Sequence, residues 1–442
     1  MRVLLLCGLV YSFSVSLFGV DRAELRSSFE AGTGSYVPSL GHFFGSAGRK
    51  LDAIASEYGR YWQPHLTESR RLIRSATRFV ERRGTALVLG AGKCREIPLQ
   101  QLARDFNHVV LVDLDLASMR EAVELIPEPL RHKVEIRVSD ITTFTRSFVL
   151  AAQRIISTAK DIEDAETRLA DLYLNLNDLV RIPDLPRADF VVSSLVLAEL
   201  ARYPNSYVAQ LFSQKFGSKI STWKNYEELR SNLFNFTIED HAQLLARVTV
   251  PTGVVYFADT TVRGPDLSMV SRGERKKVLQ ELVIHFERDG VFRKIQARPE
   301  VWNIFDNLFR KLCAIDEGNT GVEAEIVHPN EVIENIENSD DALTNWRSRV
   351  AVEAAIRLLC RGYLPIDTEI SAYQAILQSY QAIAPQSMEL LVDHKAFFKG
   401  LDGHSLKPFG ITTSWFWLEY PCSIPRKPGA FLVNSWTLRW ID

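Results

Sequence analysis

Short runs of consecutive apolar residues recur along the chain, and each is followed by a polar or helical segment. Runs of this kind are typical of parallel strands that are buried on both faces. The sequence predicts strands at Ala86–Leu89, Val109–Val112, Val134–Val138, Phe190–Val192 and Val254–Ala258. Helical patterns separate them, including Pro98–Phe106 and Glu239–Val248. The fold class is therefore α/β, with a doubly wound and mostly parallel sheet.

Apolar residues at spacings of three and four predict helices in the N-terminal region 21–83, from Ser46 to Arg83. We expect an interruption at Tyr61–Arg70, where Pro64 begins a new helical turn. The preceding stretch, Phe29–Phe44, is rich in glycine and serine and is predicted to be a loop.

Two helical stretches interrupt the strand series. Residues 144–179 form an insertion within a core at 84–263, and residues 264–404 form a larger insertion, either a lid or a separate helical domain. In the larger one we expect helices at Glu274–Arg288, Pro299–Cys313, Asp341–Arg361 and Ser371–Ala382. In the C-terminal segment 405–442, strands at Ile411–Tyr420 and Ala430–Arg439 predict an antiparallel hairpin that completes the sheet.

Composition and residue spacing argue against a nucleic-acid partner, a disulfide framework and a metal site. The net charge of −2 gives no global field that attracts nucleic acid, so no nucleic-acid partner is expected. The five cysteines have no paired spacing, and the nine histidines show no HxxxH or HxH pattern. We therefore expect neither a disulfide framework nor a metal site.

The candidate chemistry lies where the predicted strands end. The glycine turn Gly90-Ala91-Gly92 follows the first strand, Asp113 ends the second, Asp140 follows the third and Ser194 ends the fourth. Such a turn brings backbone close to a ligand, and an acid after the second strand accepts from ribose hydroxyls. Arg95 stands where a dinucleotide fingerprint has its third glycine, so a nucleoside ligand without a phosphate suits the turn better.

This order of motifs resembles the class I, Rossmann-like S-adenosylmethionine-dependent methyltransferases, over roughly residues 84–262. The resemblance implies that S-adenosylmethionine is the cofactor. It also implies that the glycine turn passes under the methionine part, that Asp113 grips the ribose, that Asp140 accepts from the adenine amino group, and that Ser194 faces the methyl group and the acceptor. The cofactor-binding residues expected from it are Gly90, Ala91, Gly92, Asp113, Leu114, Asp140, Ile141 and Ser194.

The sequence departs from the family pattern at two positions. Val88 stands where an acid is frequent, and Cys94 stands where a third glycine often follows. We expect Lys93 and Arg95 to compensate in part by meeting the carboxylate of the cofactor. The fourth strand also lacks the Asn/Asp-Pro-Pro-Tyr/Phe pattern used to methylate amide or base nitrogens, which counts against nucleic-acid or glutamine substrates. The two large helical insertions favour a roofed pocket and a small or medium-sized acceptor.

No catalytic residue is assigned from the sequence. Glu199, one turn beyond Ser194, is a candidate general base, and an exposed helix acid is the ordinary alternative. His65 is a candidate for lining the ligand, or else a packing histidine. Asp115 is an alternative ribose acceptor or a helix cap.

Three functions stay open: methyl transfer to an unidentified small acceptor, a nicotinamide-dependent (NAD) oxidoreductase, and a non-catalytic, degenerate methyltransferase fold that serves as a binding protein. The missing third glycine and the lack of a Tyr-x-x-x-Lys pair after the fourth strand count against the second function.

The apolar segment at residues 1–20 leaves open where in the cell the protein is located. Its uncharged run Val3–Val20 fits an export signal, a membrane anchor, or an unremoved or mis-started segment. We expect a cytoplasmic protein, because S-adenosylmethionine is made and kept in the cytosol, and membrane contact only through residues 1–20.

Overall fold

The computed structural model describes residues 36–266, 269–320, 329–338, 346–359, 362–420 and 429–441. Their side chains are described from residue 51 onward, except at 315–320, 334–338, 411, 420 and 429. The apolar segment 1–20, residues 29–35 of the predicted loop and most of the turn between the C-terminal strands lie outside the described residues. Among the helices that are described, none is long and apolar enough to span a membrane.

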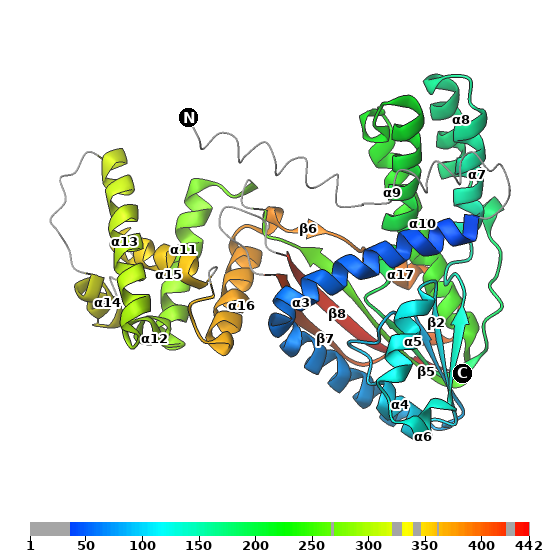
Figure 1. The fold of residues 1–442 in the computed structure, drawn as a ribbon, viewed down its shortest axis with the longest axis horizontal. Helices are drawn as coiled ribbons and strands as arrows, with labels where there is room; N and C mark the ends of the chain where they lie inside the picture. The colour runs from blue at the N-terminus through cyan, green and yellow to red at the C-terminus, as the bar shows by residue number, and fades with distance from the viewer. Residues whose placement is uncertain are drawn as a thin grey trace.

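One mixed sheet organises the chain, with the strand order β3-β2-β1-β4-β5-β8-β7 (Figure 1). Strands β1 to β5 are mutually parallel, β8 runs antiparallel to β5, and β7 runs antiparallel to β8. The short β6 pairs with the end of β5. The strands are β1 (Thr85–Leu89), β2 (His108–Asp113), β3 (Val134–Val138), β4 (Ala188–Ser194), β5 (Thr249–Arg263), β6 (Glu389–Leu390), β7 (Leu406–Tyr420) and β8 (Gly429–Trp440).

The predicted fold class and the C-terminal hairpin are confirmed. The first four strands match the predicted apolar runs to within two residues at each end, whereas β5 begins at Thr249 rather than Val254. Residues Pro251–Gly253 lie within β5, where the register with β4 shifts between Ala188 and Phe190. β5 is therefore one strand with an irregularity near its start.

Helices cover both faces of the sheet, as the doubly wound class requires. On one face, α3, α4 (Leu99–Asp105) and α5 (Leu116–Glu124) pack against side chains such as Val88 and Leu111. On the other face, α10 (Tyr226–Val248) and α17 (His394–Gly400) pack against Leu87 and Phe257. The short α6 (Glu128–Arg131) precedes β3.

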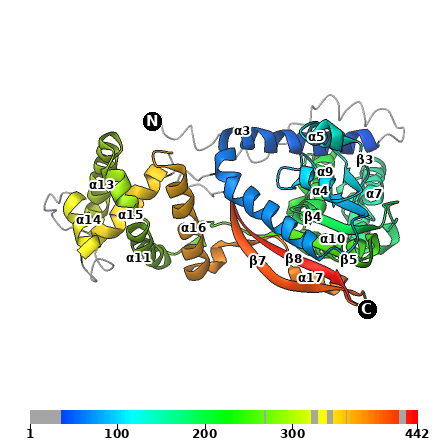
Figure 2. The same cartoon turned by 90° about the horizontal axis from the view of Figure 1, so that it is seen from below.

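The N-terminal helix differs from the prediction. Residues 36–44 are helical rather than loop, and α3 runs unbroken from Tyr36 to Ala76 with Pro64 inside it. The reason is packing: Trp62 and His65 are buried against β7, which offsets the hydrogen bond that Pro64 cannot donate. Figure 2 shows the second half of α3 lying along β7, which it contacts, and the first half running in another direction towards α5.

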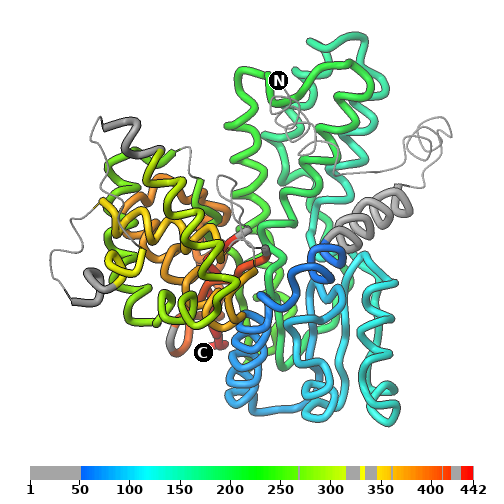
Figure 3. The backbone as a smooth tube through the Cα atoms, turned by 60° about the vertical axis from the view of Figure 1, so that its left-hand side comes forward, coloured from blue at the N-terminus to red at the C-terminus, as the bar shows by residue number. Residues whose placement is uncertain are grey.

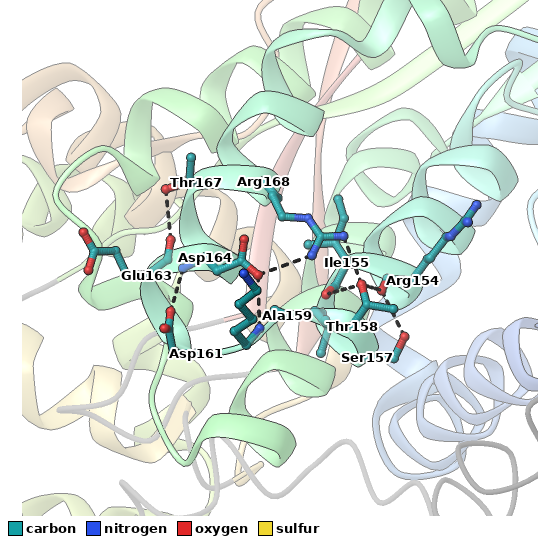
Figure 4. A network of polar contacts seen from close by, with 12 residues as sticks. Arg154, Ile155, Ser157, Thr158, Ala159, Asp161, Glu163, Asp164, Thr167 and Arg168 are labelled. Atoms are coloured by element: carbon teal, nitrogen blue, oxygen red, sulfur yellow. Dashed lines mark hydrogen bonds and ion pairs between the residues drawn. The ribbon is translucent and has the colours of Figure 1, made fainter.

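The first insertion is helical, as predicted, and contributes to a column of helices that projects from the sheet (Figure 3). Its helices α7 (Thr145–Thr158) and α8 (Ile162–Leu174) join α9 (Leu197–Phe216) and the first half of α10 around a separate apolar cluster. At the tip, Arg168 bonds to Thr158 and pairs with Asp164, which fixes the turn between α7 and α8 (Figure 4).

The second insertion is also mostly helical. Its described residues hold the predicted helices and three that were not anticipated, α12, α14 and the α17 described above. Its helices are α11 (Arg272–Arg288), α12 (Val291–Gln296), α13 (Pro299–Thr320), α14 (Pro329–Asn338), α15 (Trp346–Leu359) and α16 (Ile366–Ile383). They gather at one side of the sheet, where α16 contacts α3 and β7 (Figures 1 and 2).

Candidate functional site

The candidate site is the edge of the sheet where β1 to β4 end. In an open parallel sheet, ligands bind beyond the carboxyl ends of the strands, where the strand order reverses. Here the reversal lies between β1 and β4, which are neighbours with their helical connections on opposite faces. The glycine turn follows β1, and the loop that carries Ser194 and Leu195 follows β4.

The glycine turn has a backbone that favours glycine at two positions. Gly90 has φ +68° and Gly92 has φ +45°. A Cβ at Gly90 would lie 2.1 Å from Val196 Cγ1 and 3.5 Å from Ile141 Cδ1, so this glycine lets the loops after β1, β3 and β4 meet. A Cβ at Gly92 would meet nothing within 4 Å, so that side of the turn is open to a ligand.

Asp113 is bonded to the glycine turn. Its Oδ2 accepts from Gly92 N at 2.9 Å, and its Oδ1 accepts from Asp115 N at 2.9 Å. Desolvation raises the pKa of Asp113, and these N–H donors oppose that rise. A carboxylate has about four acceptor positions, so Asp113 keeps capacity for a hydroxyl donor. Asp115 is the N-cap of α5 and accepts from Ser118 N.

Asp140 lies at the neighbouring strand end. Asp113 pairs with Val138 in the sheet, and Asp140 follows two residues later. Its Oδ1 accepts from Thr142 N and Thr142 Oγ1, both at 2.8 Å, and burial raises its pKa. Ile141, beside it, is buried. The structure thus brings together the two carboxylates that the sequence singles out, on adjacent parallel strands.

The end of β4 is strained and well anchored. Leu195 has φ +59°, an uncommon conformation for a residue with a side chain, and its N–H donates to Ala258 O at 2.8 Å. Ser194 is 4 % exposed, and its buried hydroxyl has no hydrogen-bond partner among the described residues. A buried hydroxyl without a partner carries a free-energy cost, which a ligand could relieve.

A further acid, Asp259, supports this loop. It follows Ala258 on β5, is fully buried, and accepts from Ala198 N at 3.0 Å in the first turn of α9. Burial raises the pKa of Asp259 to about 7. The sequence prediction missed Asp259, although an acid directly after an apolar run is the same signal that identified Asp113.

Lys93 and Arg95 are already paired with acidic side chains of the chain. Lys93 Nζ lies 2.7 Å from Asp52 Oδ2 of α3 and 2.6 Å from Glu121 Oε2 of α5. Arg95 pairs with the other oxygen of Asp52. The two cations expected to meet a cofactor carboxylate therefore already share one from the chain itself, and nothing in the local sequence marks Asp52 as their partner.

The two candidate catalytic residues lie in different surroundings. His65 is 2 % exposed, stacks on Trp417 with 4.7 Å between ring centroids, and accepts from Trp415 Nε1 at 3.0 Å. Burial lowers the pKa of His65 to about 3. Glu199, in the first turn of α9, is paired with Arg202 of the same helix. Glu199 thus lies in the helix that follows Ser194 and β4, and His65 lies in the aromatic packing between α3 and β7.

Within the described residues, no group of histidine, cysteine or acidic side chains could hold a metal ion. Cys94 is buried in the glycine turn with φ +50°, and burial raises the pKa of its thiol. It is therefore not an activated nucleophile.

The topology is that of a known class. A parallel core in the order β3-β2-β1-β4-β5, extended by an antiparallel strand beside β5, is typical of Rossmann-like methyltransferases. No family model and no curated protein matches the sequence.

Among solved structures, the chain is similar to an O-methyltransferase family protein from Burkholderia thailandensis, at 13 % identity over 44 % of this chain and 39 % of that one, with a TM-score of 0.24. It is also similar to an S-adenosylmethionine-dependent methyltransferase from Clostridium acetobutylicum, at 13 % identity over 48 % and 57 %, with a TM-score of 0.24.

A third similar structure is the S-adenosylmethionine-bound amino pentose methyltransferase CalS10 from Micromonospora echinaspora, at 15 % identity over 46 % of this chain and 56 % of that one, with a TM-score of 0.22. The chain spans less than two thirds of each of these three proteins. The fold class rests on strand order and direction rather than on these overall similarities.

Proposed function

We propose that this chain binds S-adenosylmethionine at the carboxyl edge of its sheet and transfers the methyl group to a small or medium-sized acceptor. The observation that carries the proposal is Asp113, which is hydrogen-bonded to Gly92 of the open glycine turn and stands one strand away from Asp140. This arrangement offers acceptors for a ribose and for an adenine amino group from one rigid edge. In the proposal the chain acts in the cytoplasm.

The residues present fit such a ligand. The open side of Gly92 admits close approach of the ligand, and Leu114 and Ile141 lie directly after the two strands. The unpartnered hydroxyl of Ser194 lies at the end of β4, where the proposal puts the acceptor. When bound, S-adenosylmethionine supplies a methyl group on a positively charged sulfur. The residues of the chain orient the reactants and exclude water.

Calorimetric titration tests the proposal with S-adenosylmethionine, S-adenosylhomocysteine and NAD as separate ligands. Heat with the first two and none with NAD is expected. Heat with NAD alone would favour the oxidoreductase instead. If none of the three ligands gives heat, a non-catalytic binding protein is favoured.

Substitution of Asp113 tests the ribose assignment. Asp113→Ala is expected to weaken S-adenosylhomocysteine binding by about 1–3 kcal/mol, because a polar ligand group loses its partner. Asp115→Ala tests the alternative ribose acceptor, which in the structure caps α5, and should weaken binding less than Asp113→Ala. Thermal unfolding of both variants separates lost binding from a loosened turn. Equal affinity in wild type and Asp113→Ala would refute the assignment.

A further inference from the structure

Asp52 of α3 joins the N-terminal helix to the glycine turn. One carboxylate oxygen lies 2.7 Å from Lys93 Nζ, and the other pairs with Arg95. The side chains of Asp52, Lys93 and Arg95 are only 31 %, 24 % and 31 % exposed. Their attraction is therefore screened less by solvent than that of an ordinary surface pair. The hydrogen bond that Lys93 donates to Asp52 also raises the pKa of Lys93, which keeps it charged.

The cluster is balanced in charge. Lys93 pairs with both Asp52 and Glu121, and Arg95 pairs with Asp52 while its guanidinium lies 5.6 Å from the centre of the Trp62 ring. Two cations thus face two anions. A ligand carboxylate arriving at Lys93 and Arg95 would compete with Asp52 and Glu121 for these two cations.

Asp52 is the anion that can withdraw, because the helix around it is weakly held. None of the described side chains from 51 to 60 is buried, whereas Tyr61 and Trp62 are. Gly59 lies within this part of α3, where it costs about 1 kcal/mol relative to alanine. The first half of α3 passes beside α5 near the strand ends (Figures 1 and 2). This part of α3 also packs half-buried apolar side chains against the core, and Asp52 supplies its ion pairs to the glycine turn.

We propose that Asp52 is a latch that holds the first half of α3 on the glycine turn, and that a ligand carboxylate displaces it from Lys93 and Arg95. The proposal rests on the function proposed above, since it names the control of access to that same site. Ligands that carry a carboxylate release the helix, and nucleosides without one leave the latch closed.

The test compares Asp52→Asn with wild type, using two ligands. S-adenosylhomocysteine carries the carboxylate, and 5′-methylthioadenosine has the same nucleoside but no amino-acid end. Asp52→Asn should tighten S-adenosylhomocysteine at least about fivefold relative to 5′-methylthioadenosine, the lower end of typical coupling between sites. Glu57→Gln is the matched control: it removes the same charge from the same helix, at a residue without a bond to the turn among the described contacts.

Each result decides the matter. An unchanged ratio of the two affinities would overturn the latch. Weaker S-adenosylhomocysteine binding in Asp52→Asn would also overturn it, since Asp52 would then be meeting the ammonium group of the ligand. If neither ligand binds wild type or variant, the proposed function fails as well. If only the variant binds, both proposals gain support.

Hydrogen exchange tests the latch without any ligand. Asp52→Asn should speed exchange of the backbone amides at residues 51–60, while Glu57→Gln should not. Equal protection in both variants would show that Asp52 does not hold the helix, whatever the chain binds.

Discussion

Three histidines lie in apolar surroundings, and their burial determines how stability responds to acid. Burial lowers the pKa of His65 to about 3 and those of His241 and His394 to about 4. Below the ordinary histidine pKa of 6.5 the unfolded chain takes up protons that the folded chain does not. Folding stability is therefore expected to fall as the pH drops from about 6.5 towards 4.

His241 allows a single-residue test of this response. It is 1 % exposed, its Nε2 lies 2.8 Å from Ser193 Oγ, and its Nδ1 has no partner among the described residues. In His241→Asn the loss of unfolding free energy between pH 7 and pH 4.5 should shrink by about 2–3 kcal/mol. Denaturant unfolding at both pH values measures this difference. Ser193→Ala, which removes the partner but keeps the histidine, should retain the wild-type pH response; an identical response in His241→Asn would contradict the assignment.

Asp259 responds in the opposite sense. Its folded pKa of about 7 lies above the ordinary aspartate value, so the folded chain holds a proton that the unfolded chain releases. Its contribution therefore falls as the pH rises through that range and is constant above it. The histidines and Asp259 oppose one another below neutral pH, which is why the variant above isolates one group.

Strand-end residues of the candidate site were predictable because local sequence places them. An apolar run sets each strand, and the next polar residue emerges at the carboxyl edge, as with Asp113, Asp140 and Ser194. Asp52 was not predictable, and the sequence left His65 open between lining the ligand and packing. The partners of both residues lie far along the chain: Arg95 for the first and Trp415 for the second. The ligand roles of all these residues stay predictions.

At the scale of elements, proline misled the sequence analysis once, because Pro64 predicted an interruption in α3. Pro204 likewise lies inside a helix, α9. In both helices the burial of neighbouring side chains offsets the hydrogen bond that proline cannot donate. Trp62 packs against β7, and Tyr207 and Leu211 lie in the cluster formed by α7 to α10. Propensity is a weak guide where tertiary packing is this extensive.

The contact between α3 and α16 depends on one buried carboxylate. Glu369 is fully buried and accepts from Tyr61 Oη at 2.6 Å and from Leu364 N at 3.3 Å. Tyr61→Phe removes one of these donors and should lower the unfolding free energy by about 1–3 kcal/mol. Chemical denaturation is the measurement.

Tyr363→Phe is the control for that variant. Tyr363 is 37 % exposed, and such a surface substitution is expected to change stability by less than about 0.5 kcal/mol. Similar losses in Tyr61→Phe and Tyr363→Phe, or no loss in either, would show that the hydroxyl of Tyr61 does not hold α16.

At the scale of the molecule, the two helical insertions belong to different apolar clusters. The core on the α3 side of the sheet continues into the helices α11 to α16, because buried residues from Val88 to Phe305 form one cluster. The column formed by α7, α8, α9 and the first half of α10 has its own cluster, which contains no strand residue. The large insertion therefore shares its apolar core with the sheet, whereas the column has an apolar core of its own. Sequence periodicity predicted helices in both but not this difference.

The difference predicts where local unfolding occurs. Leu211 in the column and Leu102 on α4 are both leucines with almost no exposure, at 1 % and 0 %. Replacing either with alanine should destabilise its cluster by about 2–5 kcal/mol. Leu211→Ala should speed hydrogen exchange in α7, α8 and α9 while β1 to β5 keep their protection, because the column can open alone. Leu102→Ala should speed exchange across the sheet and in α11 to α16 together. Faster exchange throughout the chain in Leu211→Ala would show that the column and the sheet unfold as one unit, and would then make the projecting helices part of the rigid frame that positions the candidate site.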